Sequence, residues 1–254
     1  MRERDLAGRD GLFIAEGRVV LEKAISADPG AIASVLIAAP KLPGMADLLA
    51  GLPAATPVYA LGQAAMDQVV GFPIHRGLLA LVRRPVRTPR AVLEGLTGRA
   101  TVIVLVGISN HDNLGGIFRN AAAFGADAVL LDETCCDPLY RKAIRVSVGA
   151  TLTVPFARAG DGAAILDLVE AAGFDTIALS PAGELRLSNL LTGPRVAMLL
   201  GGEGPGLPTK LLARSRTVRI DMSRGFDSLN VATTSGIVLH HLTSRQALAA
   251  ESST

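Results

Sequence analysis

The sequence predicts an α/β protein in which a parallel sheet fills the C-terminal part and a smaller α/β unit precedes it. Apolar residues make up 49% of the 254 residues, whereas aromatic residues make up only 4% and tryptophan is absent. Buried parallel strands favour this composition, because they consist of continuous Val, Ile and Leu runs. Such runs recur after residue 100 with helical patterns between most of them, which is typical of a parallel sheet covered by helices on both faces.

The N-terminal part predicts a small α/β unit. Its expected elements, in chain order, are a helix at 16–27, a strand at 34–38, a short strand at 58–59, a helix near 63–70 and a strand at 78–82. A segment rich in proline and glycine follows at 83–99, with a short helical pattern at 91–96, and is typical of a linker. We therefore place the domain boundary near residue 90, which gives domains 1–90 and 91–254.

The C-terminal part contains six strand-like apolar runs. They lie at 101–108, 128–131, 152–156, 176–179, 196–200 and 218–222. Parallel sheets of this kind bind ligands beyond the carboxyl ends of their strands. The polar and glycine-rich segments that follow these runs are therefore the first places to look for a site.

Composition excludes several classes of protein. Cys135 and Cys136 are the only cysteines and are adjacent, so they match neither a metal-ligand spacing nor a redox pair, and we interpret them as structural. The net charge of +2 and the pI near 8.7 allow nucleic-acid binding but require local basic patches for it. The apolar runs are too short to span a membrane and the N-terminus lacks a secretory pattern, so we expect a cytoplasmic protein.

The first segment of interest follows the run that ends at Ile108. A cluster of Asn and Asp residues beginning at Asn110 suits a helix N-terminus, and Gly125 suits the position just beyond the helix end. Asn113 and Arg119 are six residues apart, about 600° around a helix, so their side chains point to different faces. On this segment alone, a capped core helix whose arginine pairs with a nearby acid is the simpler explanation.

The second segment, 199–208, places four glycines and two prolines around Glu203 after an apolar run. Glycines allow backbone groups to approach a ligand closely. The segment is not a phosphate-binding loop of the Gly-Lys-Ser/Thr type. A dinucleotide site stays open as an alternative, since Asp221 lies at a suitable distance downstream for a ribose contact.

The third segment, 227–239, begins a long C-terminal helix with small hydroxyl-bearing residues. An N-capped helix that packs closely on a neighbour explains it structurally. No serine triad can be identified, because the nucleophile pentapeptide is missing and the four histidines have no recognisable partner spacing.

Together and in this order, the three segments resemble the three signature motifs of the SpoU-TrmH family of RNA 2′-O-ribose methyltransferases, in the SPOUT superfamily. Residues 113–115 with Arg119 resemble motif one, 202–207 resemble motif two and 228–231 resemble motif three. The resemblance covers residues 100–250. The N-terminal unit is similar, less specifically, to the small ribosomal-protein-like substrate-binding domain of that family.

The resemblance implies a fold and an activity. The C-terminal domain is expected to form a trefoil knot that holds S-adenosylmethionine, and a homodimer is expected to complete the site. The implied reaction transfers a methyl group to a ribose 2′-hydroxyl of ribosomal or transfer RNA, with no metal and no membrane involved. The rival hypotheses are a non-catalytic RNA-binding or ribosome-assembly protein of the same fold and a nucleotide-binding oxidoreductase.

The resemblance also implies which residues form the site. The expected catalytic residues are Arg119, Asn113, Glu203, Ser228 and Asn230. The expected cofactor-binding residues are Leu179, Ser180, Gly201, Ile220, Met222 and Leu229. Two basic groups are candidates for RNA contacts, namely Arg83, Arg84 and Arg87 near the domain junction and Arg141 and Arg145 on one helical pattern.

A guanidinium stays protonated, so we expect Arg119 to stabilise the developing oxyanion and to orient phosphate rather than to remove a proton. Asn113 and Ser228 are expected to hold substrate hydroxyl or phosphate groups by hydrogen bonds. Glu203 is expected to orient Arg119 or to accept the proton, and Asn230 to fix the turn of motif three.

Overall fold

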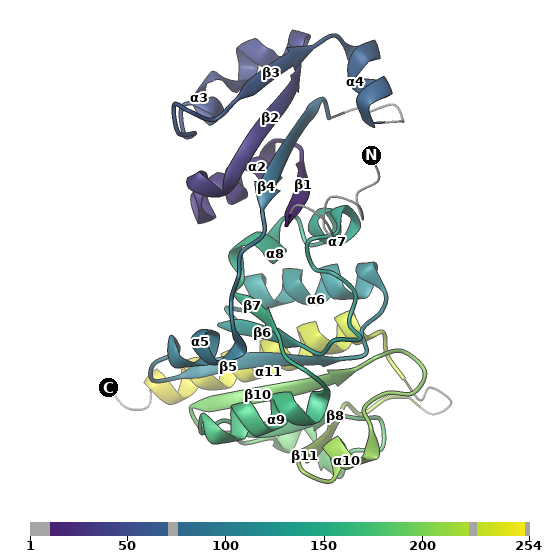
Figure 1. Ribbon diagram of the computed structural model, residues 1–254. Coiled ribbons are helices and arrows are strands. Elements are labelled where there is room, and N and C mark those ends of the chain that lie inside the picture. The colour runs from purple at the N-terminus through teal and green to yellow at the C-terminus, as the bar shows by residue number, and fades with distance from the viewer. Residues whose placement is uncertain (1–10, 71–75, 224–227, 252–254) are drawn as a thin grey trace. The chain divides into compact units, whose positions relative to one another are not determined.

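The computed structural model describes residues 11–70, 76–223 and 228–251, and the chain forms two compact units (Figure 1). Unit 1 takes the residues up to 86 together with 138–153, and unit 2 takes 87–137 together with the residues from 154 onwards. The chain therefore leaves unit 2 after Asp137 and returns to it at Val154. This excursion gives unit 1 two helices that lie far from the rest of it in sequence.

Unit 1 contains a four-stranded sheet in the order β1-β4-β2-β3. The pairs β1–β4 and β4–β2 are antiparallel and the pair β2–β3 is parallel. The strands are β1 (Leu12–Glu16), β2 (Ile32–Ala38), β3 (Val58–Leu61) and β4 (Leu78–Arg83). The helices are α2 (Arg18–Ala27), η1 (Pro29–Ala31), η2 (Ala39–Met45), α3 (Ala46–Leu49), α4 (Gln63–Val70), α7 (Arg141–Val146) and α8 (Ala150–Thr153).

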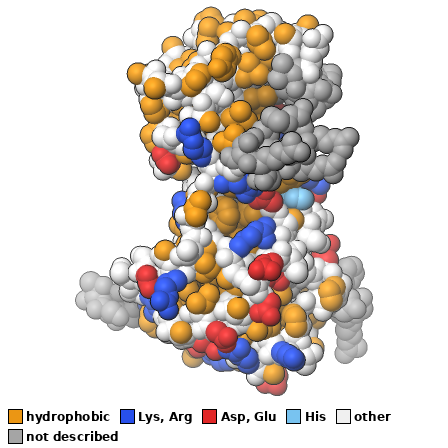
Figure 2. Space-filling view, viewed as in Figure 1, with side chains coloured by type: hydrophobic (Ala, Val, Ile, Leu, Met, Phe, Trp, Pro, Cys, Tyr) orange, Lys and Arg blue, Asp and Glu red, His pale blue; other side chains and the backbone are white. Residues whose placement is uncertain are grey.

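One face of the unit 1 sheet is buried and the other is partly exposed. Along β1 and β4, buried and half-buried residues alternate at every position up to Val82, as the two-residue period of a strand requires. On the more exposed face, Met66 of α4 covers Leu36 and Leu79, whereas Tyr59 on the edge strand β3 is 57% exposed. Figure 2 shows hydrophobic side chains gathered over the part of unit 1 that contains β2 and β3.

Unit 2 contains a seven-stranded sheet in the order β7-β6-β5-β10-β8-β11-β9, and every pair in it is parallel. The strands are β5 (Ala100–Val106), β6 (Ala128–Leu131), β7 (Phe156–Arg158), β8 (Asp175–Leu179), β9 (Leu185–Arg186), β10 (Arg195–Gly201) and β11 (Arg216–Arg219). The helices are α5 (Pro89–Glu94), α6 (His111–Ala123), α9 (Gly162–Ala171), η3 (Leu187–Asn189), α10 (Thr209–Leu212) and α11 (Val231–Glu251). The predicted parallel sheet is confirmed.

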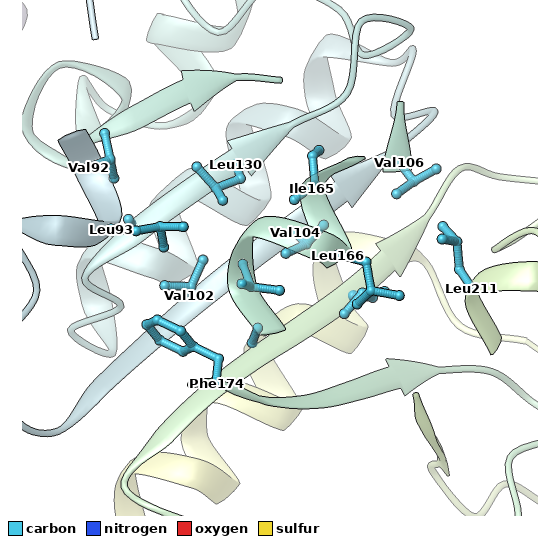
Figure 3. Packing of buried hydrophobic residues seen from close by; sticks show 14 of the residues in the cluster. Val92, Leu93, Val102, Val104, Val106, Leu130, Ile165, Leu166, Phe174 and Leu211 are labelled. Carbon is cyan, nitrogen blue, oxygen red and sulfur yellow. The ribbon is translucent and has the colours of Figure 1, made fainter. Parts of the chain in front are cut away.

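Helices cover both faces of the unit 2 sheet. The helices α5 and α9 lie on one face, and α6 and α11 lie on the other (Figure 1). On the first face, Val102 and Val104 of β5 and Leu130 of β6 pack against Ile165 and Leu166 of α9 (Figure 3). Each of these five side chains is fully buried, and burying such a side chain stabilises a fold by roughly 1.5–3 kcal/mol. The core therefore fixes the strand ends that carry the site.

Most elements agree with the sequence predictions, but the expected strand at 152–156 is wrong. Helix α8 ends at Thr153 and β7 begins only at Phe156. The apolar and β-branched run 152–154 was too short for its period to distinguish helix from strand. Strand β1 was not predicted, because its alternation of apolar residues runs directly into the apolar pattern of α2.

The helix ends follow local chemistry. Helix α6 begins after Asn110, whose side chain accepts a hydrogen bond from the Asp112 backbone N–H at 2.8 Å. It ends before Gly125, which has φ of 69° as predicted for the residue beyond a helix end. Among the described residues, no helix has both the length and the apolar character needed to span a bilayer.

Candidate active site

The candidate site is a cavity at the carboxyl ends of three neighbouring strands of unit 2, namely β10, β8 and β11. It has a volume of about 500 Å³ and is lined by the loop after β10, the segment after β11 and the residues that lead into α11. All six residues expected to bind the cofactor line it, and these are Leu179, Ser180, Gly201, Ile220, Met222 and Leu229. Glu203, Ser228 and Asn230 of the expected catalytic set also line it.

Two glycines at the start of the loop after β10, Gly201 and Gly202, lie against other backbone without room for a side chain. A Cβ atom on Gly201 would lie 2.4 Å from the carbonyl carbon of Gly206, and one on Gly202 would lie 2.3 Å from the carbonyl oxygen of Gly107. Real Cβ atoms do not approach backbone this closely, so both positions require glycine. The loop therefore presents Glu203 from a rigid support.

Three polar side chains from the three motifs form one hydrogen-bonded network. Asn113 Nδ2 donates to Glu203 Oε1 at 2.7 Å, and Asn230 Nδ2 donates to Asn113 Oδ1 at 2.8 Å and to Glu203 Oε1 at 3.4 Å. Asn113 is only 5% exposed, and a buried amide needs such partners. Segments that lie 90 and 117 residues apart in sequence are thus joined at one point.

Asn230 also caps helix α11. Its Oδ1 accepts hydrogen bonds from the backbone N–H groups of Ala232 at 2.9 Å and Thr233 at 3.3 Å. These are the donors that a helix start leaves without an internal partner. The start of α11 is therefore coupled to Asn113 and Glu203 through a single side chain.

Arg119 lies on α6 outside this network. Its side chain is exposed, and no hydrogen bond or ion pair joins it to Glu203 among the residues that the structure describes. Since α6 begins at His111, Asn113 lies in its first turn and Arg119 lies six residues later on a different face, as expected. The described cavity lining includes neither of these two residues, whereas Ser228 is exposed at the cavity.

A family model for the SpoU rRNA methylase family matches residues 100–240. The chain belongs to this family. The match begins at the first strand of the unit 2 sheet, β5, and ends within α11, so it contains all three site segments. The resemblance inferred from the motifs is thereby confirmed.

Relatives in this SpoU family extend the similarity over most of the chain. A protein of Mycobacterium bovis, described as an uncharacterized tRNA/rRNA methyltransferase, is 41% identical over 95% of this chain and 84% of its own length. A 23S rRNA (guanosine-2′-O-)-methyltransferase RlmB of Xanthomonas campestris is 31% identical over 69% of this chain and 72% of its own length. Both relatives are described as methyltransferases, and neither as an oxidoreductase.

Solved structures share the fold of this SpoU-family chain in both units. An RNA 2′-O ribose methyltransferase has a TM-score of 0.79 and 29% identity, over 97% of this chain and 93% of that one. An rRNA methyltransferase of Sinorhizobium meliloti with bound AdoMet has a TM-score of 0.82 and 23% identity, over 96% of this chain and 90% of that one. The second likeness shows the fold alone.

The five arginines expected to contact RNA fall in different environments. Arg83, Arg84, Arg141 and Arg145 belong to unit 1, and Arg87 belongs to unit 2. Arg83, Arg87 and Arg145 are exposed, and Arg84 is half-buried. Arg141 is largely buried at 21% exposure and donates to Glu16 Oε2 at 2.5 Å. It therefore holds α7 against β1, while Arg145 in the last turn of α7 faces solvent.

Asp132, at the end of β6, was not among the residues predicted for the site, although it holds the backbone beside the loop that carries Glu203. This carboxylate is 4% exposed and accepts hydrogen bonds from the backbone N–H groups of Gly107, Thr134 and Cys135. Gly107 is the residue whose carbonyl lies against Gly202. An acidic residue directly after a buried parallel strand was the available signal, because such strand ends border the site.

The two cysteines of the SpoU-family chain are free, as their spacing indicated. Burial raises the pKa of Cys135 to about 12 and the pKa of Cys136 to about 11. The Cys135 thiol lies between the backbone of β5 and Ile108, accepting from the Ile108 N–H at 3.3 Å and donating to the Leu105 carbonyl at 3.4 Å. Thiols in this environment pack as small apolar residues and are poor nucleophiles.

Proposed function

We propose that this chain transfers a methyl group from S-adenosylmethionine to a ribose 2′-hydroxyl of ribosomal or transfer RNA. The observation that carries the proposal is the network of Asn113, Glu203 and Asn230 at the rim of a cavity formed by strand ends. Support for the ribose target comes from the guanosine-2′-O- relative at 31% identity and the 2′-O ribose methyltransferase structure at 29% identity.

The cavity suits S-adenosylmethionine in size and lining. Its volume of about 500 Å³ lies within the roughly 300–1,000 Å³ of small-molecule sites. Leu179, Ile220 and Leu229 supply apolar surface, and Gly201 exposes backbone at a strand end, where adenine edges can form hydrogen bonds. The cofactor supplies an activated methyl group, and these residues would hold it beside Glu203.

The protein's own groups would align the ribose and stabilise charge. In-line displacement requires the 2′-hydroxyl to be held near the methyl group, and Ser228, which is exposed at the rim, can hydrogen-bond to it. Arg119 stays protonated and would stabilise the oxygen as it loses its proton. The Glu203 carboxylate, oriented by two amide donors, is the candidate acceptor of that proton.

The charges of unit 1 support a role in RNA binding. Its described residues include nine Lys and Arg residues and five Asp and Glu residues. In unit 2, the described residues up to 244 include eleven Lys and Arg residues and thirteen Asp and Glu residues. RNA affinity depends strongly on phosphate contacts. We therefore assign substrate binding to unit 1, with Arg83, Arg84 and Arg145 as contacts together with Arg87 of unit 2.

Three further features belong to this proposal. We propose that unit 2 is a trefoil knot, that a homodimer completes the site, and that the protein acts in the cytoplasm.

The test is methyl transfer from labelled S-adenosylmethionine to total RNA isolated from cells that lack this protein, followed by nuclease digestion. We expect a labelled, nuclease-resistant 2′-O-methylated dinucleotide. Arg119→Ala should lower the rate by at least about 100-fold with unchanged cofactor binding in calorimetry. Arg90→Ala, an exposed arginine on α5, is the matched control and should retain activity. Absence of cofactor binding by the wild type would overturn the proposal.

A further inference from the structure

Helices α6 and α11 pack together through small residues beside the site. A Cβ atom on Gly116 would lie 2.7 Å from the Cβ of Ala232, and one on Gly236 would lie 3.2 Å from the amide nitrogen of Asn120. Glycines at these two positions let the helix backbones approach closely. Small residues alone leave such a pair free to slide, so the register needs a directional contact.

Asn120 supplies that contact. Its Nδ2 donates to the Ala232 carbonyl at 2.7 Å and to Ser235 Oγ at 2.9 Å. Ser235 is fully buried, and its hydroxyl donates to the same Ala232 carbonyl at 2.7 Å. The Asn120 amide of α6 therefore hydrogen-bonds to two groups in the first turns of α11.

Asn120 and Asn113 form a two-point connection between the helices. They are seven residues apart, about 700° around the helix, so they lie on nearly the same face, about 10 Å apart along the axis. Asn113 contacts Asn230 just before α11, and Asn120 contacts Ala232 and Ser235 just inside it. Both rotation and sliding of α6 against α11 are thereby fixed.

We infer that Asn120 is a positioning residue for the proposed reaction, acting through its neighbour Arg119. Arg119 is exposed on α6, whereas Ser228 and Asn230 precede α11. The register of the two helices therefore sets where the guanidinium stands relative to the ribose at the cavity rim. The inference rests on the proposed function, because it takes Arg119 as the group that stabilises the reacting oxygen.

Substitution of Asn120 by alanine should separate positioning from folding. The Ser235 hydroxyl and the Ala232 carbonyl keep their mutual hydrogen bond in Asn120→Ala, so no buried polar atom of this pair is left without a partner. The described lining of the cavity includes no residue of α6; α11 contributes only Val231 and Thr234, neither of which hydrogen-bonds to Asn120, and the other lining residues come from β8, β10, β11, α10 and the adjoining loops. We therefore expect kcat to fall by roughly tenfold or more, with the Kd for S-adenosylmethionine within about twofold of wild type.

Thr243→Val is the matched control. Thr243 Oγ1 donates to the Phe124 carbonyl at 3.1 Å, so this variant also removes a hydrogen bond between α11 and the end of α6, but farther from the site. A purely structural role of Asn120 predicts equal losses of kcat in Asn120→Ala and Thr243→Val when their Tm values are equal. That result would overturn the inference.

A double-mutant cycle tests the route through Arg119. Adding Asn120→Ala to Arg119→Ala should lower kcat little further, because the group that Asn120 positions is already missing. Additive losses would overturn the inference. Hydrogen exchange gives a readout that does not need turnover: amides of 231–236 should exchange faster in Asn120→Ala than in Thr243→Val. An inactive wild type would overturn the proposed function, whereas unchanged exchange would overturn the positioning role by itself.

Discussion

The two units differ in how closely their glycines approach other atoms. In unit 2, Cβ atoms on Gly183, Gly201 and Gly202 would lie 2.3–2.5 Å from backbone atoms. In unit 1, a Cβ atom placed on any described glycine comes no closer than 3.0 Å to another atom, and at that distance the neighbour is a side-chain atom, as at Gly17. Backbone cannot yield as a side chain can. The glycines at the cavity of unit 2 are thus constrained by backbone, whereas the closest contacts of the unit 1 glycines are with side chains.

Charge and exposure differ in the same way. Unit 1 is the more basic unit, and both tyrosines of the chain, Tyr59 and Tyr140, are exposed in it. In unit 2, Phe118 packs edge-on against Phe156 and Phe174 lies under Arg195. Both differences support the proposed division, in which unit 2 holds the reacting groups and unit 1 binds RNA.

The largest effect is expected from Gly202→Ala. The added methyl would overlap the Gly107 carbonyl oxygen, and relieving this clash must displace the loop that carries Glu203. We expect a loss of more than about 3 kcal/mol in the free energy of unfolding and loss of cofactor binding, measured by urea denaturation and calorimetry. Near-wild-type values would show that the loop is not tightly constrained.

The thiols provide a second measure of the packing in unit 2. With the pKa of Cys136 raised to about 11 by burial, little thiolate exists at pH 8, so alkylation by iodoacetamide should be roughly 100-fold slower than in urea. A raised pKa also means that the folded state binds this proton more tightly. Stability should therefore fall as the pH rises above the ordinary thiol pKa. Rapid alkylation of the native protein would contradict the packing described.

Removing charge from unit 1 should weaken RNA binding without affecting the chemistry. In the double variant Arg83→Ala and Arg145→Ala, we expect RNA affinity to fall by roughly tenfold and the slope of log K against log salt to decrease by about two. The Kd for S-adenosylmethionine should not change. The matched control removes two exposed cations of unit 2, Arg90 and Lys210. An equal loss of RNA affinity in this control would contradict the assignment of RNA binding to unit 1.

The smallest effect is expected from Gly44→Ala in unit 1, at a position inside the helix η2. No atom lies within 4 Å of the added methyl, and the backbone there is not in the left-handed region. Alanine should therefore stabilise the protein by about 0.4–1 kcal/mol through the unfolded state, measured by urea denaturation. Destabilisation as large as that of Gly202→Ala would show that the units do not differ in tolerance.

Much of the fold could be predicted from the sequence because it depends on local patterns. The runs of β5, β6 and β10 are apolar over nearly their whole length, and this identifies them as buried parallel strands. The predictions failed where patterns were short or merged, as at residues 152–156. No local pattern could predict that residues 138–153 belong to unit 1, because this depends on contacts between segments far apart in the sequence.

For the site, the sequence by itself determined which residues are chemically able to act. Asn113, Glu203 and Asn230 stand out through their motifs. Only the tertiary structure decided that the Glu203 carboxylate contacts two amides and not Arg119, and that Arg141 is held by Glu16. It also decided that Asp132 binds the Gly107 N–H and that Asn120 binds the Ala232 carbonyl. The physical reason is that these contacts join segments far apart in the chain, and their partners are set by how the sheet and helices pack.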